Sequence, residues 1–200
     1  MSVLVGKEAP DFTAVAVMPD NTFDENFNLR DYTKGKIAVL FFWPADFTFV
    51  CPSEIIAFNN RMEEFKKRNV AVVGCSVDSQ FVHLTWKNTP VENGGVGNVR
   101  FPMVSDLGGD ICRKYDILSP AKLAYRATFL IDQEGKVIHQ IVNELSIGRN
   151  IDDLIRTIDA LMFTQEHGDV CPANWKKGQE AIKPTKEGIA DFLKNNAEKL

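Results

Sequence analysis

The sequence has no apolar stretch long enough to cross a membrane as a helix. Its longest strongly apolar run, residues 37–43, falls far short of the roughly 20 residues that a helix needs to span a bilayer. The first residues also lack the charged segment followed by an apolar segment that marks a secretory signal. We therefore expect a soluble cytoplasmic protein that makes no contact with a membrane.

Basic residues are slightly outnumbered by acidic ones. The 23 Lys and Arg residues against 27 Asp and Glu residues leave a formal net charge of −4 and an isoelectric point near 5.4. Proteins that neutralise nucleic-acid phosphates carry a basic surplus instead, so we expect no nucleic-acid partner. The hydrophobic fraction of 44% is ordinary for a globular chain and supplies enough apolar material for a core.

Cysteine and histidine are too scarce and too scattered for a disulfide scaffold or a structural metal site. A disulfide-stabilised domain is shorter and richer in cysteine, and structural zinc favours close pairs such as C-x2-C. The closest two cysteines lie far outside that spacing. We therefore expect no metal and no cofactor, and the question becomes which thiol is reactive. The cysteines are Cys51, Cys75, Cys112 and Cys171, and the histidines are His83, His139 and His167.

Runs of apolar residues predict the strands of a sheet. Residues 37–43 and 70–77 are apolar on both faces, which is typical of central strands in a covered sheet. Residues 127–132 and 137–142 predict a hairpin closed by a short polar turn. The opening residues 6–17 predict a short edge strand.

Helices are predicted between and after these strands. Apolar residues spaced three or four apart predict one helix after the first strand, and they are Ile55, Phe58, Met62 and Phe65. A second long helix is expected from an N-cap at Asn150 to a stop at Gly168. Shorter helices are expected over 109–115 and 189–200.

The order of these elements indicates the domain organisation. Strands that alternate with helices are typical of an α/β protein. Beyond Gly168 the chain turns polar and irregular. We therefore expect one α/β domain over residues 1–168 and a C-terminal tail over 169–200 that carries Cys171.

Cys51 stands where a thiol would be reactive. We expect it to be the N-cap of the helix that follows the first central strand, with Pro52 at the first helical position. Unpaired N–H groups and the helix dipole at such a position favour a thiolate. Thr48 can offer a hydroxyl, and Pro44 can shield the loop from water. The alternative is that Cys51 only packs as a small apolar residue in a capping turn.

The segment around Cys51 resembles that of a known family. Pro44-x-x-x-Thr48-x-x-Cys51 matches the P-x-x-x-[TS]-x-x-C motif of peroxiredoxins, and residues 47–54 are similar to the typical two-cysteine branch, which includes the bacterial alkyl hydroperoxide reductase C subunit. A Val-Cys-Pro sequence around Cys171 extends the resemblance over nearly the whole chain. The resemblance implies a thioredoxin-like fold, in which helices flank a central mixed sheet. It also implies thiol-dependent reduction of hydrogen peroxide and organic hydroperoxides.

The resemblance assigns roles to five residues. Cys51 would attack the peroxide and become a sulfenic acid. Pro44, Thr48 and Arg126 would bind the substrate with it, and Thr48 and Arg126 would donate to the peroxide oxygens and the sulfur. Cys171 would then resolve the sulfenic acid in a disulfide with Cys51 of a second subunit.

Three more residues stand at family positions, and we predict that they support the site. They are Glu54, Trp86 and Arg149. Their ordinary alternatives stay open: a charge at a helix start, a core aromatic residue and a solvated arginine. Cys75 and Cys112 fall within predicted packed elements, so we expect both to be inert structural residues.

The resemblance also implies partners. Family members form homodimers, and commonly rings of five dimers, so we expect a homodimer and a decamer. Thioredoxin or a dedicated flavoprotein reductase would reduce the Cys51–Cys171 disulfide, and the sequence does not distinguish them.

Two other functions remain as alternatives. A disulfide oxidoreductase of the thioredoxin type would need C-x-x-C at the helix start, and the chain has Glu54 at the second cysteine position. A ring-forming holdase chaperone is a possible secondary activity, and a client-aggregation assay would test it.

Overall fold

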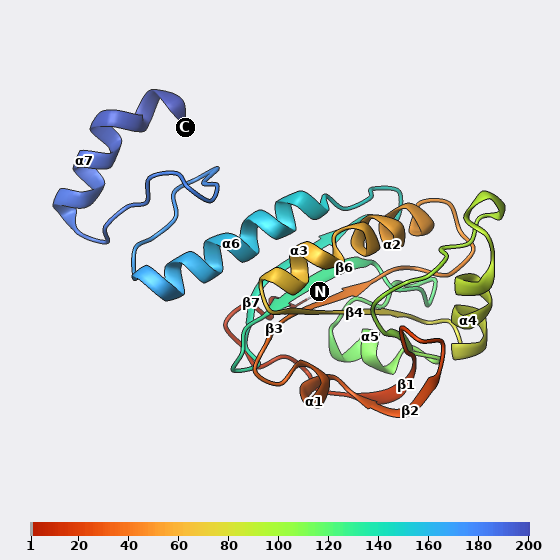
Figure 1. The fold of residues 1–200 in the computed structure, drawn as a ribbon. Coiled ribbons are helices and arrows are strands. Elements are labelled where there is room, and N and C mark those ends of the chain that lie inside the picture. Colours follow the sequence, from red (N-terminus) through yellow and green to blue (C-terminus); the bar gives the residue numbers. More distant parts are fainter. Residues whose placement is uncertain (1) are drawn as a thin grey trace. The chain divides into compact units, whose positions relative to one another are not determined.

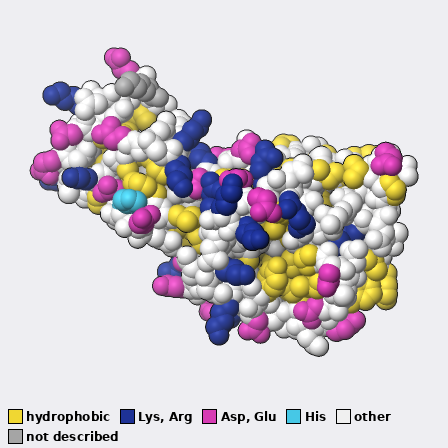
Figure 2. Space-filling model, in the orientation of Figure 1, with side chains coloured by type: hydrophobic (Ala, Val, Ile, Leu, Met, Phe, Trp, Pro, Cys, Tyr) yellow, Lys and Arg dark blue, Asp and Glu magenta, His cyan; other side chains and the backbone are white. Residues whose placement is uncertain are grey.

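The computed structural model describes residues 2–200, apart from the side chain of Lys199. The chain forms two compact units, one that ends at Arg149 and one over Asn150–Leu200. The second unit therefore holds the long predicted helix together with residues 169–200, which we predicted as a tail. On the face drawn in Figure 2, basic and acidic side chains are interspersed, and hydrophobic side chains gather on the unit that ends at Arg149.

The first unit is built on one mixed seven-stranded sheet in the order β2-β1-β5-β4-β3-β6-β7 (Figure 1). β3 pairs in parallel with β4, which pairs in parallel with β5, and the remaining pairings are antiparallel. The strands are β1 (Thr13–Val17), β2 (Phe23–Asn28), β3 (Ile37–Phe42), β4 (Val70–Ser76), β5 (Met103–Ser105), β6 (Arg126–Ile131) and β7 (Val137–Asn143).

The apolar runs located the central strands. β3 and β4 are buried at every position, and β3 lies between β4 and β6 as expected for a covered sheet. The prediction of an edge strand near the amino terminus was wrong, because β1 pairs with β2 on one side and β5 on the other. β2 lacks an apolar run, since its centre reads Asp-Glu-Asn, and β5 has only three residues.

Aromatic and aliphatic side chains pack on both faces of this sheet. On one face, Leu40 and Phe42 of β3 join a core cluster with Tyr115, just after α5. On the other face, Phe41 stacks on Phe58 of α2, with ring centroids 3.9 Å apart. The helices of this unit are α1 (Leu29–Thr33), α2 (Cys51–Asn60), α3 (Met62–Lys67), α4 (Gln80–Asn88), the 3-10 helix η1 (Val91–Asn93) and α5 (Asp110–Lys114).

β4 passes unusually close to the aromatic face. A Cβ atom at Gly74 would lie 2.8 Å from the Trp43 ring and 3.0 Å from the Phe41 ring. These separations are shorter than carbon–carbon van der Waals contact. Glycine therefore lets the strand pack directly beneath the residues that lead into α2.

The second unit contains α6 (Ile151–His167), α7 (Lys186–Asn196) and the 3-10 helix η2 (Ala197–Lys199). α6 begins and ends where the sequence predicted: the Asn150 side chain accepts from the Asp153 N–H, and Gly168 ends the helix with φ 72°. An antiparallel bridge between Val170 and Ile182 closes a loop that carries Cys171. None of the helices in residues 2–200 combines the length and the apolar character needed to cross a membrane.

Candidate active site

Cys51 lies at the start of α2, just past the carboxyl end of β3. The residue is the first of the helix and Val50 is its N-cap, so the predicted register was wrong by one position. The reason is that the Val50 carbonyl accepts the first helical hydrogen bond, from the Glu54 N–H at 3.3 Å. The Cys51 side chain is fully buried, and the amino-terminal end of the helix directs its dipole toward it.

Arg126, the first residue of β6, contacts the sulfur of Cys51. Its Nη1 lies 3.2 Å from Cys51 Sγ and 2.7 Å from Glu54 Oε2, and its Nε donates to the Leu145 carbonyl at 2.7 Å. Burial alone would lower the pKa of Arg126, but its contacts with Cys51 and Glu54 raise it. The guanidinium is thus held charged and oriented next to the thiol.

Glu54 joins this arginine to a second one. Its two carboxylate oxygens accept from Arg149 Nε at 2.8 Å and from Arg149 Nη2 at 2.7 Å. Burial would raise the pKa of Glu54, but Arg149 and Arg126 lower it below its usual value. The cluster therefore contains two cations and one anion, which leaves one positive charge in excess beside Cys51.

Arg149 is not a solvated residue. Its Nη1 donates to the carbonyls of Phe42 and Ala127 at 2.8 and 2.9 Å, and its guanidinium lies 5.1 Å from the centre of the Phe41 ring. The same side chain therefore contacts the last residue of β3, the first residues of β6 and the first turn of α2. This arrangement fixes the distance between the strand that carries Arg126 and the helix that carries Cys51.

The loop between β3 and α2 holds Pro44 and Thr48. Pro44 is buried. The half-buried Thr48 donates its hydroxyl to the Ala45 carbonyl at 2.8 Å, within the loop. Between them, Phe47 adopts a left-handed φ of 53°, a conformation that costs about 1–3 kcal/mol for a bulky residue. The structure thus places Thr48 on the loop near Cys51, with its hydroxyl satisfied by the backbone.

A buried polar network that our sequence reasoning missed holds this loop. Asp46 accepts from Trp43 Nε1 at 2.8 Å and lies 2.7 Å from His83 Nδ1. His83 Nε2 faces the Val104 carbonyl at 3.2 Å, and since a carbonyl only accepts, that nitrogen carries a proton. Burial raises the pKa of Asp46, against the opposing effect of His83.

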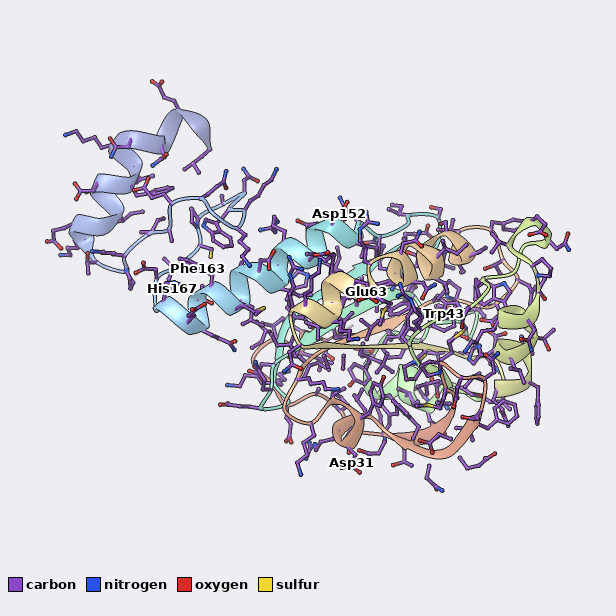
Figure 3. The ribbon with its side chains drawn as sticks, in the orientation of Figure 1. Asp31, Trp43, Glu63, Asp152, Phe163 and His167 are labelled. Atoms are coloured by element: carbon purple, nitrogen blue, oxygen red, sulfur yellow. The ribbon has the colours of Figure 1, made fainter. Side chains whose placement is uncertain are left out.

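The network had a weak signal in the sequence. Asp46 lies between Pro44 and Thr48, and His83 lies on α4, a helix that the sequence analysis did not define. In the sequence, His83 is one of three scattered histidines, whose spacing argues against a metal site. Among residues 2–200, no cluster of His, Cys, Asp and Glu could hold a metal ion, and the network instead ties the loop to α4 and β5. Figure 3 labels Trp43, which directly follows β3.

Trp86 lies in the layer beneath the loop rather than in the arginine cluster. Its ring is 6.0 Å from that of Phe47 and 6.4 Å from that of Trp43. Its Nε1 donates to the Gly94 carbonyl at 2.9 Å. Trp86 is therefore a buried core aromatic residue that packs against the loop, and its support of the site stays a prediction.

All four cysteines are free thiols. Cys75 and Cys112 are buried in the core, and burial raises the pKa of both. Cys171 is half-buried in the second unit, where its sulfur lies 3.8 Å from the Ala160 carbonyl. Burial raises its pKa also, with an opposing effect of Arg156.

Comparisons with known proteins find relatives over nearly the whole chain. Residues 5–140 match the AhpC/TSA family, and residues 160–195 match the C-terminal domain of 1-Cys peroxiredoxin. Alkyl hydroperoxide reductase C of Helicobacter pylori is 51% identical over 198 residues, which cover 99% of this chain and 100% of that protein. Peroxiredoxin-1 of Gallus gallus is 50% identical over 190 residues, 94% of each chain.

A solved structure shows the same fold. The reduced 2-Cys peroxiredoxin of Plasmodium vivax has 47% identity and a TM-score of 0.94, with 97% of this chain and 100% of that chain covered. The likeness, together with the mixed sheet and its flanking helices, confirms the predicted thioredoxin-like α/β fold.

Proposed function

This chain belongs to the AhpC/TSA family and is a thiol-dependent peroxidase, and we propose that Cys51 is the residue that reduces hydrogen peroxide and organic hydroperoxides. The observation that carries the proposal is the 3.2 Å contact between Arg126 Nη1 and Cys51 Sγ, inside a cluster with one excess positive charge. Positive charge and helix-end N–H groups stabilise a negative sulfur, and the thiolate is the nucleophilic form of cysteine.

In the first step, the Cys51 thiolate attacks one oxygen of the peroxide. An S–O bond forms as the O–O bond breaks, so sulfur is oxidised to a sulfenic acid and the peroxide is reduced. The departing oxygen takes up a proton and leaves as water or as an alcohol. Negative charge moves from sulfur to that oxygen, and donors that follow this movement lower the barrier.

Arg126 and Thr48 are the donors that we assign to this step. The Arg126 guanidinium already faces the sulfur and can donate from several N–H groups at once. The Thr48 hydroxyl can turn from the Ala45 carbonyl toward a bound peroxide, because a hydroxyl both donates and accepts. Pro44 contributes a buried wall without an N–H that needs a partner. Glu54 and Arg149 orient Arg126, and Trp86 supports the loop.

In the second step, Cys171 of a second subunit attacks the Cys51 sulfenic sulfur. A disulfide forms and hydroxide leaves, which becomes water with the proton from Cys171. The disulfide is then reduced by thioredoxin or by a dedicated flavoprotein reductase. We further propose a cytoplasmic location, because a reducing compartment supplies these electrons.

We propose that the chain forms a homodimer and a decamer of five dimers. Two features support self-association. β7 ends the sheet, and β6 is the one strand that it pairs with among the described residues. Its first residue, Val137, exchanges backbone hydrogen bonds with Gly6 and Lys7, so the outer edge beyond Val137 can receive another strand. Large hydrophobic side chains are also exposed near the Cys51 loop and elsewhere in the first unit, including Phe47, Phe49, Phe81 and Leu107. Sedimentation velocity of the reduced and oxidised protein would distinguish a dimer from a decamer.

The function is tested with two serine variants. Cys51→Ser should abolish peroxide consumption, because the nucleophile is lost. Cys171→Ser should allow one round of Cys51 oxidation and block turnover with either reductant. Cys75→Ser is the matched control and should leave turnover intact. Thiol-dependent turnover by the Cys51→Ser variant would rule the assignment out.

A thioredoxin-type activity is not favoured by the geometry. The position where that chemistry needs a second cysteine is held by Glu54, whose carboxylate is occupied by Arg126 and Arg149. Insulin reduction in the absence of peroxide would be the evidence for such an activity.

A further inference from the structure

One face of α6 holds the segment that carries Cys171. Arg156, Ala160 and Phe163 are spaced four and three residues apart, so they lie along the same side of the helix. The sulfur of Cys171 lies 3.8 Å from the Ala160 carbonyl. Arg156 Nη1 donates to the Trp175 carbonyl at 3.3 Å, and the Phe163 and Trp175 rings lie 5.0 Å apart. Figure 3 labels Phe163 on the last turns of α6.

This position disfavours ionisation of Cys171. Burial raises the pKa of the thiol, and a carbonyl oxygen such as that of Ala160 accepts from the S–H but repels a thiolate. Arg156 is the charged group that acts in the opposite direction among the described residues of this unit. It does so from the same helix face that supplies the carbonyl.

Arg156 is itself held in place. Its Nε lies 2.7 Å from Asp153 Oδ1, and its Nη1 is bonded to the Trp175 carbonyl. The guanidinium is therefore oriented from two sides, by α6 and by the segment that follows Cys171. Asp153 forms an ion pair with Arg156, and Asp152 and Asp159 line the same surface hollow as Arg156.

We infer that Arg156 is a positioning residue for the resolving half of the peroxidase cycle, because its fixed positive charge keeps the docked Cys171 able to ionise. The inference rests on the proposed role of Cys171. In the resolving step, the Cys171 thiolate attacks the sulfenic sulfur of Cys51 on the partner subunit, an S–S bond forms and the S–O bond breaks. The Cys171 sulfur is oxidised, the sulfenic sulfur is reduced, and the thiol proton leaves with hydroxide as water.

The first experiment measures the thiol alone, without peroxide. In a Cys51→Ser background, the rate of Cys171 alkylation by iodoacetamide is followed from pH 6 to 11 by mass spectrometry. Arg156→Gln removes the charge but keeps a donor for the Trp175 carbonyl, and Arg156→Lys keeps the charge. We expect Arg156→Gln to raise the pH midpoint of the Cys171 alkylation rate by about half a pH unit. At a pH below the midpoint, this shift lowers the ionised fraction of the thiol about threefold. The Lys variant should keep the parental midpoint.

A matched control separates Arg156 from the general charge of its surroundings. Lys177 lines the same surface hollow of about 490 Å³ as Arg156, but Arg156 is the cation that acts on Cys171. Lys177→Gln should therefore leave the midpoint unchanged. Equal midpoints in all variants, an equal shift with Lys and Gln at position 156, or an equal shift with Lys177→Gln would each overturn the inference.

The second experiment follows resolution in the chain with Cys51 intact. After one equivalent of hydrogen peroxide at pH 7, Arg156→Gln should form the intersubunit disulfide about threefold more slowly, with the rate of Cys51 oxidation unchanged. An unchanged rate of disulfide formation would overturn the role of Arg156 in resolution. If Cys51 did not react with peroxide at all, the proposed function would fail, whereas the alkylation result would stand independently.

Discussion

Glu54 and Arg149 form a bidentate ion pair in which Nε and Nη2 of the arginine lie 2.8 and 2.7 Å from different carboxylate oxygens. Both side chains are almost fully buried, with exposures of 2% and 3%. Because the remaining oxygen lone pairs are taken by Arg126 and by the Arg149 N–H, the carboxylate has no need of water. The pair joins the segment after β7 to the helix that begins at Cys51.

Removal of this carboxylate should destabilise the fold. Glu54→Gln leaves two buried guanidiniums without their counter-ion, and breaking a buried pair in this way costs about 3–5 kcal/mol. Urea unfolding of the reduced protein measures the change. Glu63→Gln is the control, because the Glu63–Arg100 pair is exposed and such pairs contribute about 0–1 kcal/mol. A similar loss of unfolding free energy in the two variants would contradict a stabilising role of the buried cluster.

Arg126→Lys should slow the peroxide reaction while the protein stays folded. Lysine keeps the charge but not the planar set of donors that faces Cys51 Sγ and Glu54 together. Loss of one oriented donor in a transition state costs about 10²–10³ in rate. Stopped-flow measurement of Cys51 oxidation gives the rate constant, and Arg113→Lys, at an exposed pair, serves as the control. A rate within twofold of the parent would refute the donor assignment.

Lys87 should make stability depend on pH in the alkaline range. The residue is 4% exposed and its Nζ donates to the Met18 carbonyl at 2.7 Å. Burial lowers its pKa from 10.5 to about 8 in the folded state. Between these values the unfolded chain binds more protons, so the free energy of unfolding rises with pH, by up to about 3 kcal/mol from this group.

The measurement compares the parent with Lys87→Met by urea unfolding at pH 7, 9 and 10.5. Other groups titrate in this range, so the quantity of interest is the difference in unfolding free energy between the two proteins. The unfolding free energy of the parent should increase relative to that of Lys87→Met as pH rises. Lys36→Met, which removes a lysine from an exposed position, should show a constant difference. A flat difference for Lys87→Met would show that the buried amine does not titrate as described.

Trp86→Phe should loosen the turn that follows α4. The variant keeps an aromatic ring beside Phe47 but loses the N–H that donates to the Gly94 carbonyl, and a lost neutral hydrogen bond costs about 0.5–1.5 kcal/mol. Hydrogen exchange should therefore rise in residues 94–97. Exchange in the hairpin turn at 133–136 is the internal reference, and an equal rise there would indicate general destabilisation instead.

The strands were predictable where both sides are buried. β3 and β4 form continuous apolar runs because helices and loops cover both faces of the sheet, whereas the polar β2 and the three-residue β5 produce no such run. The site residues were identified from a resemblance to a family, which gives their positions in the sequence but not the distances between them in space. Glu54 and Arg149 are 95 positions apart, and only the sheet order brings them together.

The network of Asp46 and His83 could not be predicted in the same way. The two residues are 37 positions apart and belong to a loop and to a helix whose register was not defined. Their carboxylate–imidazole contact depends on the path of residues 43–50 over the end of the sheet. That path is set by tertiary packing, including the left-handed backbone at Phe47, which β-branched and aromatic residues adopt only when the surroundings impose it.

The close passage of β4 under the aromatic rings limits how this protein can evolve. Every substitution at Gly74 adds at least a Cβ atom, which would meet Trp43 and Phe41 at 2.8 and 3.0 Å. The ring of Phe41 also packs on Phe58 and Arg149, so a shift of this ring would disturb both of those contacts. In a library of single variants, we therefore expect every active clone to keep glycine at position 74. Another residue there would require a second, compensating change to a smaller residue at position 41 or 43.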